Sequence, residues 1–539
     1  MIRRLLPIVL ILTLLLTSCF PGDGSDAASS EAMESEPAVV VEEATRDNTL
    51  EVFMVGAPYS WGDQGDFYTT NYLLGSFSSN TYVWGERGHI YYSALNNFQS
   101  ETELNIHITY GQAHELWTYL DDGNIPDLIV SDTRADISEM MAQEQFLDLL
   151  PYFENDGIYT EGKYVNQVLK AGMYNDHQYV FPLVFSMNSL LTSKESLERH
   201  DLFVSRDQTY NELLTTFTDS YNAADHSDDT HFLKATDPTS TTGSIYQLFA
   251  AASGQPSYDP KTGSITLDRD LFEKLALLYE AFCCYDFQTD RAGLKELALT
   301  TNNHLRADEQ HSRYFRLFFN GTLVTERFDL SKDVFACFGE GGGWGFDLHS
   351  TLTQAYYYES CYRDAEEEFQ IIGIPEKNDP DAYSAIVTMF GVIPSGAAHP
   401  DEAYELLKIL ANSEIFPHFG MSINRDRLNE SFEYYTSTYY DYYSMQMPDM
   451  SNELAVYRIQ PMTQETSAYL QEMVDNIGTV VLPNMYEQMI IENAVEGYVY
   501  GNIDTLDAAY EQAVTDLETY YSGTLTADEE YELVWQHGR

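Results

Sequence analysis

Alternating strand and helix patterns near residues 50–132 constrain the fold of this chain more than any other feature. They predict a strand at 50–55, a helix at 89–100, a strand at 104–110, a helix at 114–121 and a strand within 124–132. This order is typical of a parallel sheet covered by helices, so we expect an α/β fold. Ligands of such sheets bind at the carboxyl ends of the strands. Asp132, at the end of the last strand, is therefore a candidate ligand contact.

The charge of the chain excludes one large class of partner. The 539 residues include 85 acidic and 28 basic side chains, for a formal net charge of −57. A nucleic-acid-binding protein needs a basic face, so no nucleic-acid partner is expected. The same charge opposes adsorption to an anionic bilayer. Because 44% of the residues are hydrophobic and 14% aromatic, we expect a folded chain with two domains rather than a disordered one.

The amino terminus has the pattern of a lipoprotein signal. Arg3 and Arg4 precede an apolar run that ends in Leu16-Thr17-Ser18-Cys19, and this run is too short to span a bilayer. We expect residues 1–18 to be a signal peptide and Cys19 to be the lipidated residue, the alternative being a secretory signal with an incidental cysteine. Residues 19–48 then form an acidic, flexible tether. The expected location is the outer face of a cell membrane, of the Gram-positive type, with a Gram-negative envelope left open.

Four further cysteines do not predict a metal site. Cys283, Cys284, Cys337 and Cys361 form no Cys-x-x-Cys pair, and two adjacent cysteines cannot serve as independent ligands without strain. We expect buried free thiols, the alternative being a disulfide between Cys337 and Cys361. No metal and no cofactor are expected.

Motifs of catalysis are incomplete. His114-Glu115 begins like a metalloprotease helix, but Thr118 stands where the second histidine is required. There is no Gly-x-Ser-x-Gly motif, and the glycine-rich segment 339–345 lacks the Lys-Ser/Thr of a phosphate loop. A glycosidase is not excluded by counting acids, since carboxylate pairs are abundant. The preferred interpretation is that the chain is not an enzyme.

Several sequence segments, in a constant order, carry a family resemblance. They are 93–132, 145–150, 174–182, 188–195, 318–324, 371–375, 390–396 with 400–410, 420–424, and 497–509. Together they resemble family 1 of the extracellular solute-binding proteins, the substrate receptors of carbohydrate ABC importers. Thr192-Ser193 and Ser422 depart from the usual residues of that family.

The resemblance implies a periplasmic-binding-protein-like fold with two α/β lobes. The first lobe would comprise residues 49–184 plus 371–412, the second 188–370 plus 420–523, and a C-terminal tail 524–539. Strand crossovers would lie near 182–188, 370–375 and 410–424. Ligand would bind between the lobes and favour the closed arrangement, since it contacts both lobes only there.

The same resemblance implies a small-molecule ligand and a membrane partner. The ligand would be a sugar or oligosaccharide, the partners ABC permease subunits, and the receptor a monomer that meets the membrane only through Cys19. A polyamine, a peptide or a metal chelate is the alternative ligand, and a sensory or adhesive role is a further one.

Candidate ligand contacts follow from strand ends, crossovers and aromatic positions. Sugars present polar edges and apolar faces, so their receptors combine aromatic rings with polar side chains. Phe185, Ser186 and Asn188 lie at the first expected crossover, and Phe390 opens the segment 390–396 of the resemblance.

The remaining candidates each have an alternative interpretation. Gly243 and Ser244 either begin a helix that faces the ligand or form an ordinary N-cap. Glu326 and Arg327 are either contacts or a surface ion pair. Trp344 is either a stacking platform or a plug for its own loop, while Trp61 and Tyr486 are further aromatic candidates. The tyrosine-rich segment 434–443 is expected to be a solvated helix face rather than an extension of the site.

Overall fold

The structure is a computed structural model in which part of the chain is described. The described residues are 48–55, 67–68, 98–99, 101–102, 104–111, 113–132, 137–199, 202–223, 233–235, 249, 253, 257–259, 262, 264–286, 289–300, 334–337, 351–364, 366–412, 420–444, 455–482, 484–522, 525 and 533. The signal segment and tether expected over residues 1–48 lie outside this part except for its last residue. In the described part no helix is long and apolar enough to cross a membrane.

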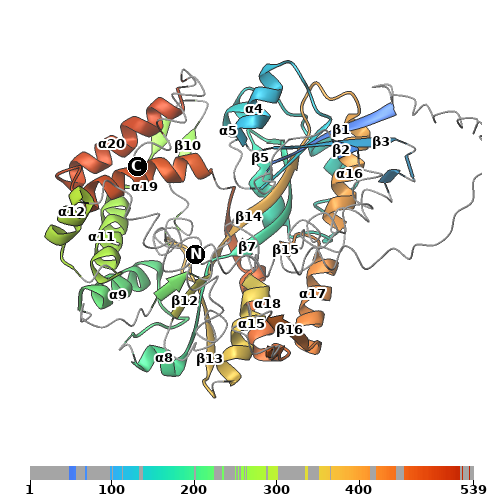
Figure 1. Cartoon of the computed structure of the whole chain (residues 1–539). Coiled ribbons are helices and arrows are strands. Elements are labelled where there is room, and N and C mark those ends of the chain that lie inside the picture. The colour runs from blue at the N-terminus through green and yellow to red at the C-terminus, as the bar shows by residue number, and fades with distance from the viewer. Residues whose placement is uncertain are drawn as a thin grey trace, which may run out of the picture. The chain divides into compact units, whose positions relative to one another are not determined.

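A large mixed sheet contains eight of the described strands (Figure 1). Its order is β15-β7-β14-β4-β1-β3-β2, with β18 paired to β14. The strands are β1 (Thr49–Val55), β2 (Phe67–Tyr68), β3 (Asn105–Gly111), β4 (Leu128–Asp132), β7 (Val180–Met187), β14 (Tyr383–Val392), β15 (Met421–Ser422) and β18 (Ile477–Val481). The strands β1, β3 and β4 are parallel, as the sequence predicts, and β14 is antiparallel to β4.

A small sheet contains four of the described strands in the order β13-β8-β12-β9. They are β8 (Ser189–Ser193), β9 (Leu233–Ala235), β12 (Val334–Cys337) and β13 (Phe369–Gly373). Three two-stranded ladders complete the described strands: β5 (Met173–Tyr174) with β6 (His177–Gln178), β10 (Ser257–Asp259) with β11 (Ser264–Thr266), and β16 (Tyr440–Ser444) with β17 (Ala455–Ile459).

Helices pack on both sheets. Those in contact with strands of the large sheet include α4 (Ala113–Asp121), α7 (Asn166–Leu169), α16 (Pro400–Asn412) and α17 (Arg425–Ser437). Those in contact with the small sheet include α8 (Lys194–Arg199), α15 (Thr351–Asp364) and α18 (Gln464–Asp475). A further group packs together: α9 (Tyr210–Ala223), α11 (Arg269–Asp286), α12 (Arg291–Thr300), α19 (Met485–Val499) and α20 (Leu506–Tyr520). Two short helices, α5 (Ser138–Ala142) and α6 (Leu150–Asn155), follow β4.

Two hydrophobic cores meet at the small sheet. Leu191 and Ile371 belong to the core of the large sheet, whereas their neighbours Leu190 and Ile372 belong to the core of the α9, α11, α19 and α20 group. Successive side chains of a strand point to opposite faces, so β8 and β13 each contribute to both cores.

The sheet membership of three strands differs from the lobe boundaries expected from the sequence. The strand β13 pairs with β8 in the small sheet, although residues 371–373 were expected in the first lobe. The strands β15 and β18 pair with β7 and β14 in the large sheet, although 420–523 was expected in the second. Short returning strands are therefore placed by long-range pairing that their own sequences do not specify.

Candidate functional site

Two strand connections pass from one sheet to the other, and they lie side by side. The strand β7 pairs with β14 in the large sheet, and after Asn188 the chain continues as β8 in the small sheet. The strand β13 pairs with β8, and the chain continues after Pro375 as β14 in the large sheet. The Ile374 amide donates to the Asn188 carbonyl at 3.0 Å, which joins the two connections. Residues 182–188 and 370–375 are thus at the crossovers that the resemblance implies.

The first crossover is anchored to the beginning of a helix. The hydroxyls of Ser186 and Thr351 are 2.9 Å apart, and Thr351, the first residue of α15, donates to the Met187 carbonyl at 2.6 Å. The Met187 amide donates back to the Thr351 hydroxyl at 3.0 Å. Both side chains are fully buried. Ser186, a predicted ligand contact, therefore ties β7 to α15.

The next residue along this crossover, Asn188, has a different environment. Its side chain is 1% exposed, yet neither its amide nitrogen nor its amide oxygen has a hydrogen-bond partner among the described residues. Ser189, Ser384 and Thr388 are also buried, and their hydroxyls also have no partner in this part of the chain. Buried polar atoms without partners are rare in folded proteins, and they mark this junction for functional consideration.

The second crossover is surrounded by aromatic and cationic side chains. The Gly373 amide donates to the Tyr469 hydroxyl at 3.1 Å, and the hydroxyls of Tyr469 and Tyr383 are 3.3 Å apart. The guanidinium of Arg206 lies 3.8 Å from the centre of the Tyr469 ring, and its Nε donates to the Ile371 carbonyl at 3.0 Å. Burial, and then the hydrogen bond with Tyr469, raise the pKa of Tyr383 well above its ordinary value of 10. Tyr383 therefore stays protonated and keeps its hydrogen atom for bonding.

The carboxyl end of β4, which contains the candidate contact Asp132, lies next to β14. Asp132 is the last residue of β4, and its backbone pairs with Met389. Ser131 is fully buried and pairs with Phe390. Asp132 thus lies at the carboxyl end of a strand, as the sequence predicts, and its role as a ligand contact stays a prediction.

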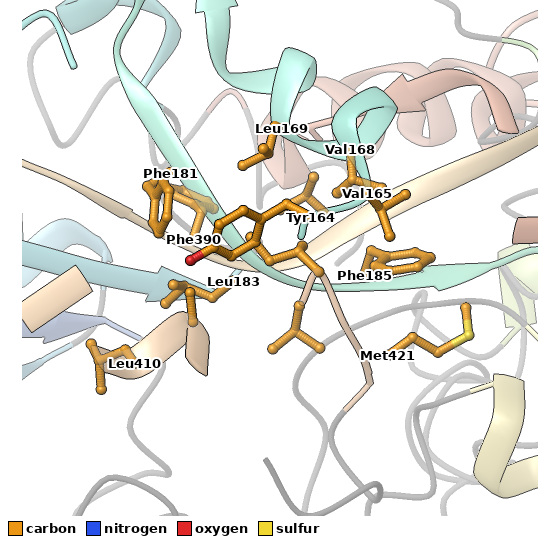
Figure 2. Close-up of a cluster of buried hydrophobic side chains, with 14 of the residues drawn as sticks. Tyr164, Val165, Val168, Leu169, Phe181, Leu183, Phe185, Phe390, Leu410 and Met421 are labelled. Atoms are coloured by element: carbon orange, nitrogen blue, oxygen red, sulfur yellow. The ribbon is translucent and has the colours of Figure 1, made fainter. Parts of the chain in front are cut away.

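Phe185 and Phe390 lie inside the core of the large sheet. Both are fully buried, and Phe185 pairs with Met421 of β15 (Figure 2). Phe390 belongs to the same cluster, and its backbone pairs with Pro182 of β7. In this conformation the two rings pack inside the core next to the crossover. Contact with a ligand would require them to become exposed. Their role as ligand contacts stays a prediction.

The other predicted contacts are placed only in part. Gly243, Ser244, Glu326, Arg327, Trp344 and Trp61 lie outside the described residues, as does Cys19. Tyr486 is the second residue of α19. The tyrosine-rich segment contains the end of α17 and the strand β16, and there Tyr434 is 43% exposed whereas Tyr435 is 1% exposed.

The structure brings further residues to the crossovers that the sequence did not indicate. They are Thr351, Tyr383, Ser384, Tyr469 and Arg206, which come from four separate segments of the chain. Tyr383 and Ser384 lie on the same strand as Phe390, a few residues before the segment Phe390–Gly396 that carried the resemblance, and this proximity is the sequence signal for them. For the other three, only the folded structure reveals the contact.

The described cysteines do not form a metal site. Cys283 is buried and Cys284 half-buried, and both are free thiols, as predicted for buried cysteines. Burial raises the pKa of Cys284 to about 11, so its thiol stays protonated. The side chains of Cys337 and Cys361 are not described, and their pairing stays open. Among the described residues, no group of three or more His, Cys, Asp or Glu side chains could hold a metal ion.

Comparisons with known proteins identify the fold. No family model matches the sequence, and no curated protein does. A putative oligosaccharide periplasmic-binding protein from Synechococcus sp. MITs9220, solved in complex with zinc, has 12% identity and a TM-score of 0.51, covering 88% of this chain and 99% of its own. The galacto-N-biose-/lacto-N-biose I-binding protein of the ABC transporter from Bifidobacterium longum, solved with lacto-N-biose, has 11% identity and a TM-score of 0.50, covering 89% and 98%.

A third similar structure carries the family name. It is an extracellular solute-binding protein family 1 member from Alicyclobacillus acidocaldarius, with 12% identity and a TM-score of 0.48, covering 88% of this chain and 98% of its own. The two structures with TM-scores of 0.50 and 0.51 are binding proteins of the kind that the sequence resemblance implies. The mixed α/β fold of periplasmic solute-binding proteins is confirmed.

Proposed function

We propose that this chain is the substrate-binding protein of an ABC importer, and that it captures a sugar or oligosaccharide by hinge closure. The observation that carries the proposal is the pair of crossovers at Asn188 and Ile374, which connect the two sheets side by side. A rotation about two adjacent extended segments can change the arrangement of the sheets while each sheet stays intact. Ligand that contacts both sides in one arrangement shifts the population toward it.

The chemistry near the crossovers fits a neutral, hydroxylated ligand. The buried polar side chains there include Ser186, Asn188, Ser189, Thr351, Ser384 and Thr388, and these are uncharged. Amide and hydroxyl groups both donate and accept hydrogen bonds, as sugar hydroxyls do. A polyamine would instead need several converging carboxylates. The lacto-N-biose bound to the similar protein from Bifidobacterium longum supports the same class of ligand.

The remaining parts of the proposal concern delivery. The chain would be held at the outer face of the membrane by lipidated Cys19 and the acidic tether 19–48, and would act as a monomer. It would hand its ligand to permease subunits encoded by other genes. Asp132, Gly243, Ser244, Glu326, Arg327, Trp344 and Tyr486 remain the proposed ligand contacts, with Phe185, Ser186, Asn188 and Phe390 at the crossovers. No catalytic step, cofactor or nucleic acid is involved.

Thermal unfolding of the full-length protein with a panel of solutes tests this function. The panel contains mono- and oligosaccharides, polyamines and short peptides. A ligand present at about 100 times its dissociation constant adds about 2.7 kcal/mol to the stability, which gives a readily measured rise in Tm. A rise with one glycan series supports the proposal, whereas a rise with polyamines or peptides alone would contradict the sugar assignment.

Two matched substitutions then test the site. Asp132→Asn is expected to reduce the ligand-dependent rise in Tm, because the carboxylate at the strand end would lose its charge-assisted hydrogen bond to the ligand. Asp122→Asn is the control, since Asp122 is exposed in the turn after α4. Equal rises in the two variants would exclude Asp132 from the site. Trp344→Ala, which removes the proposed stacking platform, is expected to reduce the rise as well.

A further inference from the structure

The strands β7 and β14 separate at Asn188. Their antiparallel register includes the pair Val387 and Phe185. Continuing that register by three residues along each strand places Ser384 opposite Asn188. The ladder ends before this point, because β7 ends at Met187 and the Asn188 carbonyl accepts a hydrogen bond from Ile374 of the other crossover. By this extrapolation Asn188 and Ser384 occupy opposite positions where the two strands part, while the Tyr383–Ile386 part of β14 pairs with β18.

Both side chains carry polar atoms that the described structure does not satisfy. Asn188 and Ser384 are each 1% exposed, and the amide nitrogen and oxygen of Asn188 and the hydroxyl of Ser384 have no partner among the described residues. Opposite residues of an antiparallel pair project from the same face of the sheet. An amide and a hydroxyl are complementary hydrogen-bonding groups, since each can donate and accept.

Unsatisfied buried groups raise the free energy of the conformation that contains them. A second conformation in which the same groups are bonded is favoured relative to the first by that difference. Ser186 gives the contrast two residues earlier, because its hydroxyl is bonded to Thr351 and keeps β7 attached to α15. Along this crossover, the Ser186 side chain is therefore hydrogen-bonded, whereas that of Asn188, the first residue after β7, has no partner among the described residues.

We propose that Asn188 and Ser384 form a polar switch at the hinge, unpartnered in the conformation described and hydrogen-bonded to each other in the second conformation. The proposal rests on the proposed function, which requires two arrangements of the sheets. Asn188 is then a positioning residue: it changes the affinity for ligand through the conformational equilibrium and does not need to touch the ligand.

The first test uses the ligand-free, full-length protein and two asparagines. Asn188→Leu keeps the volume similar and removes the unsatisfied atoms, so it is expected to raise Tm by a few degrees. Asn424→Leu is the matched control, because the side chain of Asn424 is also buried but makes three hydrogen bonds, and its replacement is expected to lower Tm. If Asn188→Leu lowers Tm as Asn424→Leu does, then Asn188 has a partner in the described conformation, such as an internal water, and the switch is overturned.

The second test measures the switch itself by hydrogen exchange at the Ile374 amide. Asn188→Leu is expected to slow this exchange, because it removes the bond that favours the second conformation. Ser384→Ala should slow it as well, and the double variant should add nothing, since both substitutions remove the same bond. Unchanged exchange, or additive effects, would overturn the proposal. Ser384→Ala alone supplies the exchange measurement if Asn188→Leu does not fold.

The outcome is separate from that of the solute panel. The exchange experiment contains no ligand, so its failure would remove the switch and leave the receptor function standing. Failure of all sugars in the melting panel, with the coupling between Asn188 and Ser384 intact, would instead remove the sugar assignment.

Discussion

Two junctions of the molecule contain a buried asparagine, and the two side chains differ in their hydrogen bonds. Asn424 is 3% exposed and begins α17; its side-chain oxygen accepts from the amides of Asp426 and Arg427, and its nitrogen donates to Asn412. Asn188 is 1% exposed and has no side-chain partner in the described part of the chain. The residue type and the burial are the same. We infer from this difference that the number of hydrogen-bond partners of the side chain, and not its burial, distinguishes a rigid junction from one that can rearrange.

The largest expected effect on stability is at Gly420, in the segment that leads to Asn424. Gly420 has a φ of +141°, and a Cβ atom there would lie 2.0 Å from Val184 Cγ1 and 3.2 Å from the Phe185 carbonyl oxygen. Gly420→Ala is expected to lower the free energy of unfolding by about 3 kcal/mol, because it combines backbone strain with a clash against β7. Urea unfolding measures the change.

Gly123→Ala is the control for that substitution. Gly123 has a φ of +83° and nothing within 4 Å of the added Cβ, so only the strain contributes, about 1 kcal/mol. Equal losses in the two variants would mean that β7 is not closely packed at Gly420 and that this junction is as adaptable as the one at Asn188.

The second effect concerns the rigid asparagine. Asn424→Leu is expected to lower the free energy of unfolding by about 2 kcal/mol, because the α17 N-terminus loses its cap and the buried Asn424 side chain loses all three of its hydrogen bonds. Asn424→Ser keeps a capping oxygen and should recover about half of the loss. The comparison breaks if Asn424→Leu and Asn188→Leu change the stability in the same direction by similar amounts.

A third effect tests whether the second crossover is a satisfied junction. Tyr469→Phe keeps the ring beneath Arg206 but removes the oxygen that accepts from the Gly373 amide, so a loss of about 1 kcal/mol is expected. Tyr383→Phe removes only the hydroxyl that faces Tyr469 and should have a smaller effect. If Tyr383→Phe is the more damaging variant in urea unfolding, the Gly373 bond is not the main contact at this crossover.

The smallest expected effect on stability comes from the partly exposed pair His177 and Asp148. The hydrogen bond between His177 and Asp148, 2.7 Å long, raises the pKa of His177 above 6.5. Burial opposes the effect at Asp148, but its hydrogen bonds with His177 and two backbone amides prevail and lower the pKa of that carboxyl. The stabilisation from His177 is therefore complete below about pH 6.5 and is lost as the pH rises through the folded-state pKa. That from Asp148 is present above about pH 4 and is lost on acidification.

Asp148→Asn tests this window. It keeps the oxygen that accepts from the amides of Leu150 and Gln178 and removes the charge. The NMR titration of His177 should move to lower pH, and the stability difference from the native chain should be greater near pH 6 than near pH 8.5. Asp176→Asn, which removes only a through-space charge, should shift the titration less. A larger shift in the control would assign the raised pKa to the general acidic surroundings.

Local sequence patterns predicted part of the fold well. The strands at 49–55, 105–111 and 128–132 and the helix at 113–121 agree closely with the predicted ranges, because alternation and apolar runs are local signals. The eight buried residues of β7 form an almost continuous apolar run of the same kind. The pairing of β13, β15 and β18 was not predictable in this way, since a strand of two to five residues takes its place from partners far along the chain.

The candidate site was predictable to a smaller extent. The crossover at 182–188 and the strand end at Asp132 followed from the resemblance and from strand topology. That Asn188 lacks partners while Ser186 is bonded to Thr351 could not be read from the sequence, because the two residues have similar neighbours in the chain. Satisfaction of a polar atom depends on the position of groups more than 160 residues away, such as Thr351.

The small sheet separates the two hydrophobic cores and contributes side chains to both of them. Leu190 and Leu191 of β8, and Ile371 and Ile372 of β13, face opposite sides, so each of these strands loses half of its packing if either core melts. Exposing the apolar face of a strand to water costs about 25 cal/mol per Å². The two cores therefore depend on each other for integrity, and heating should unfold both in one cooperative transition. A chain built in this way can bend at its crossovers while neither core becomes exposed to proteases.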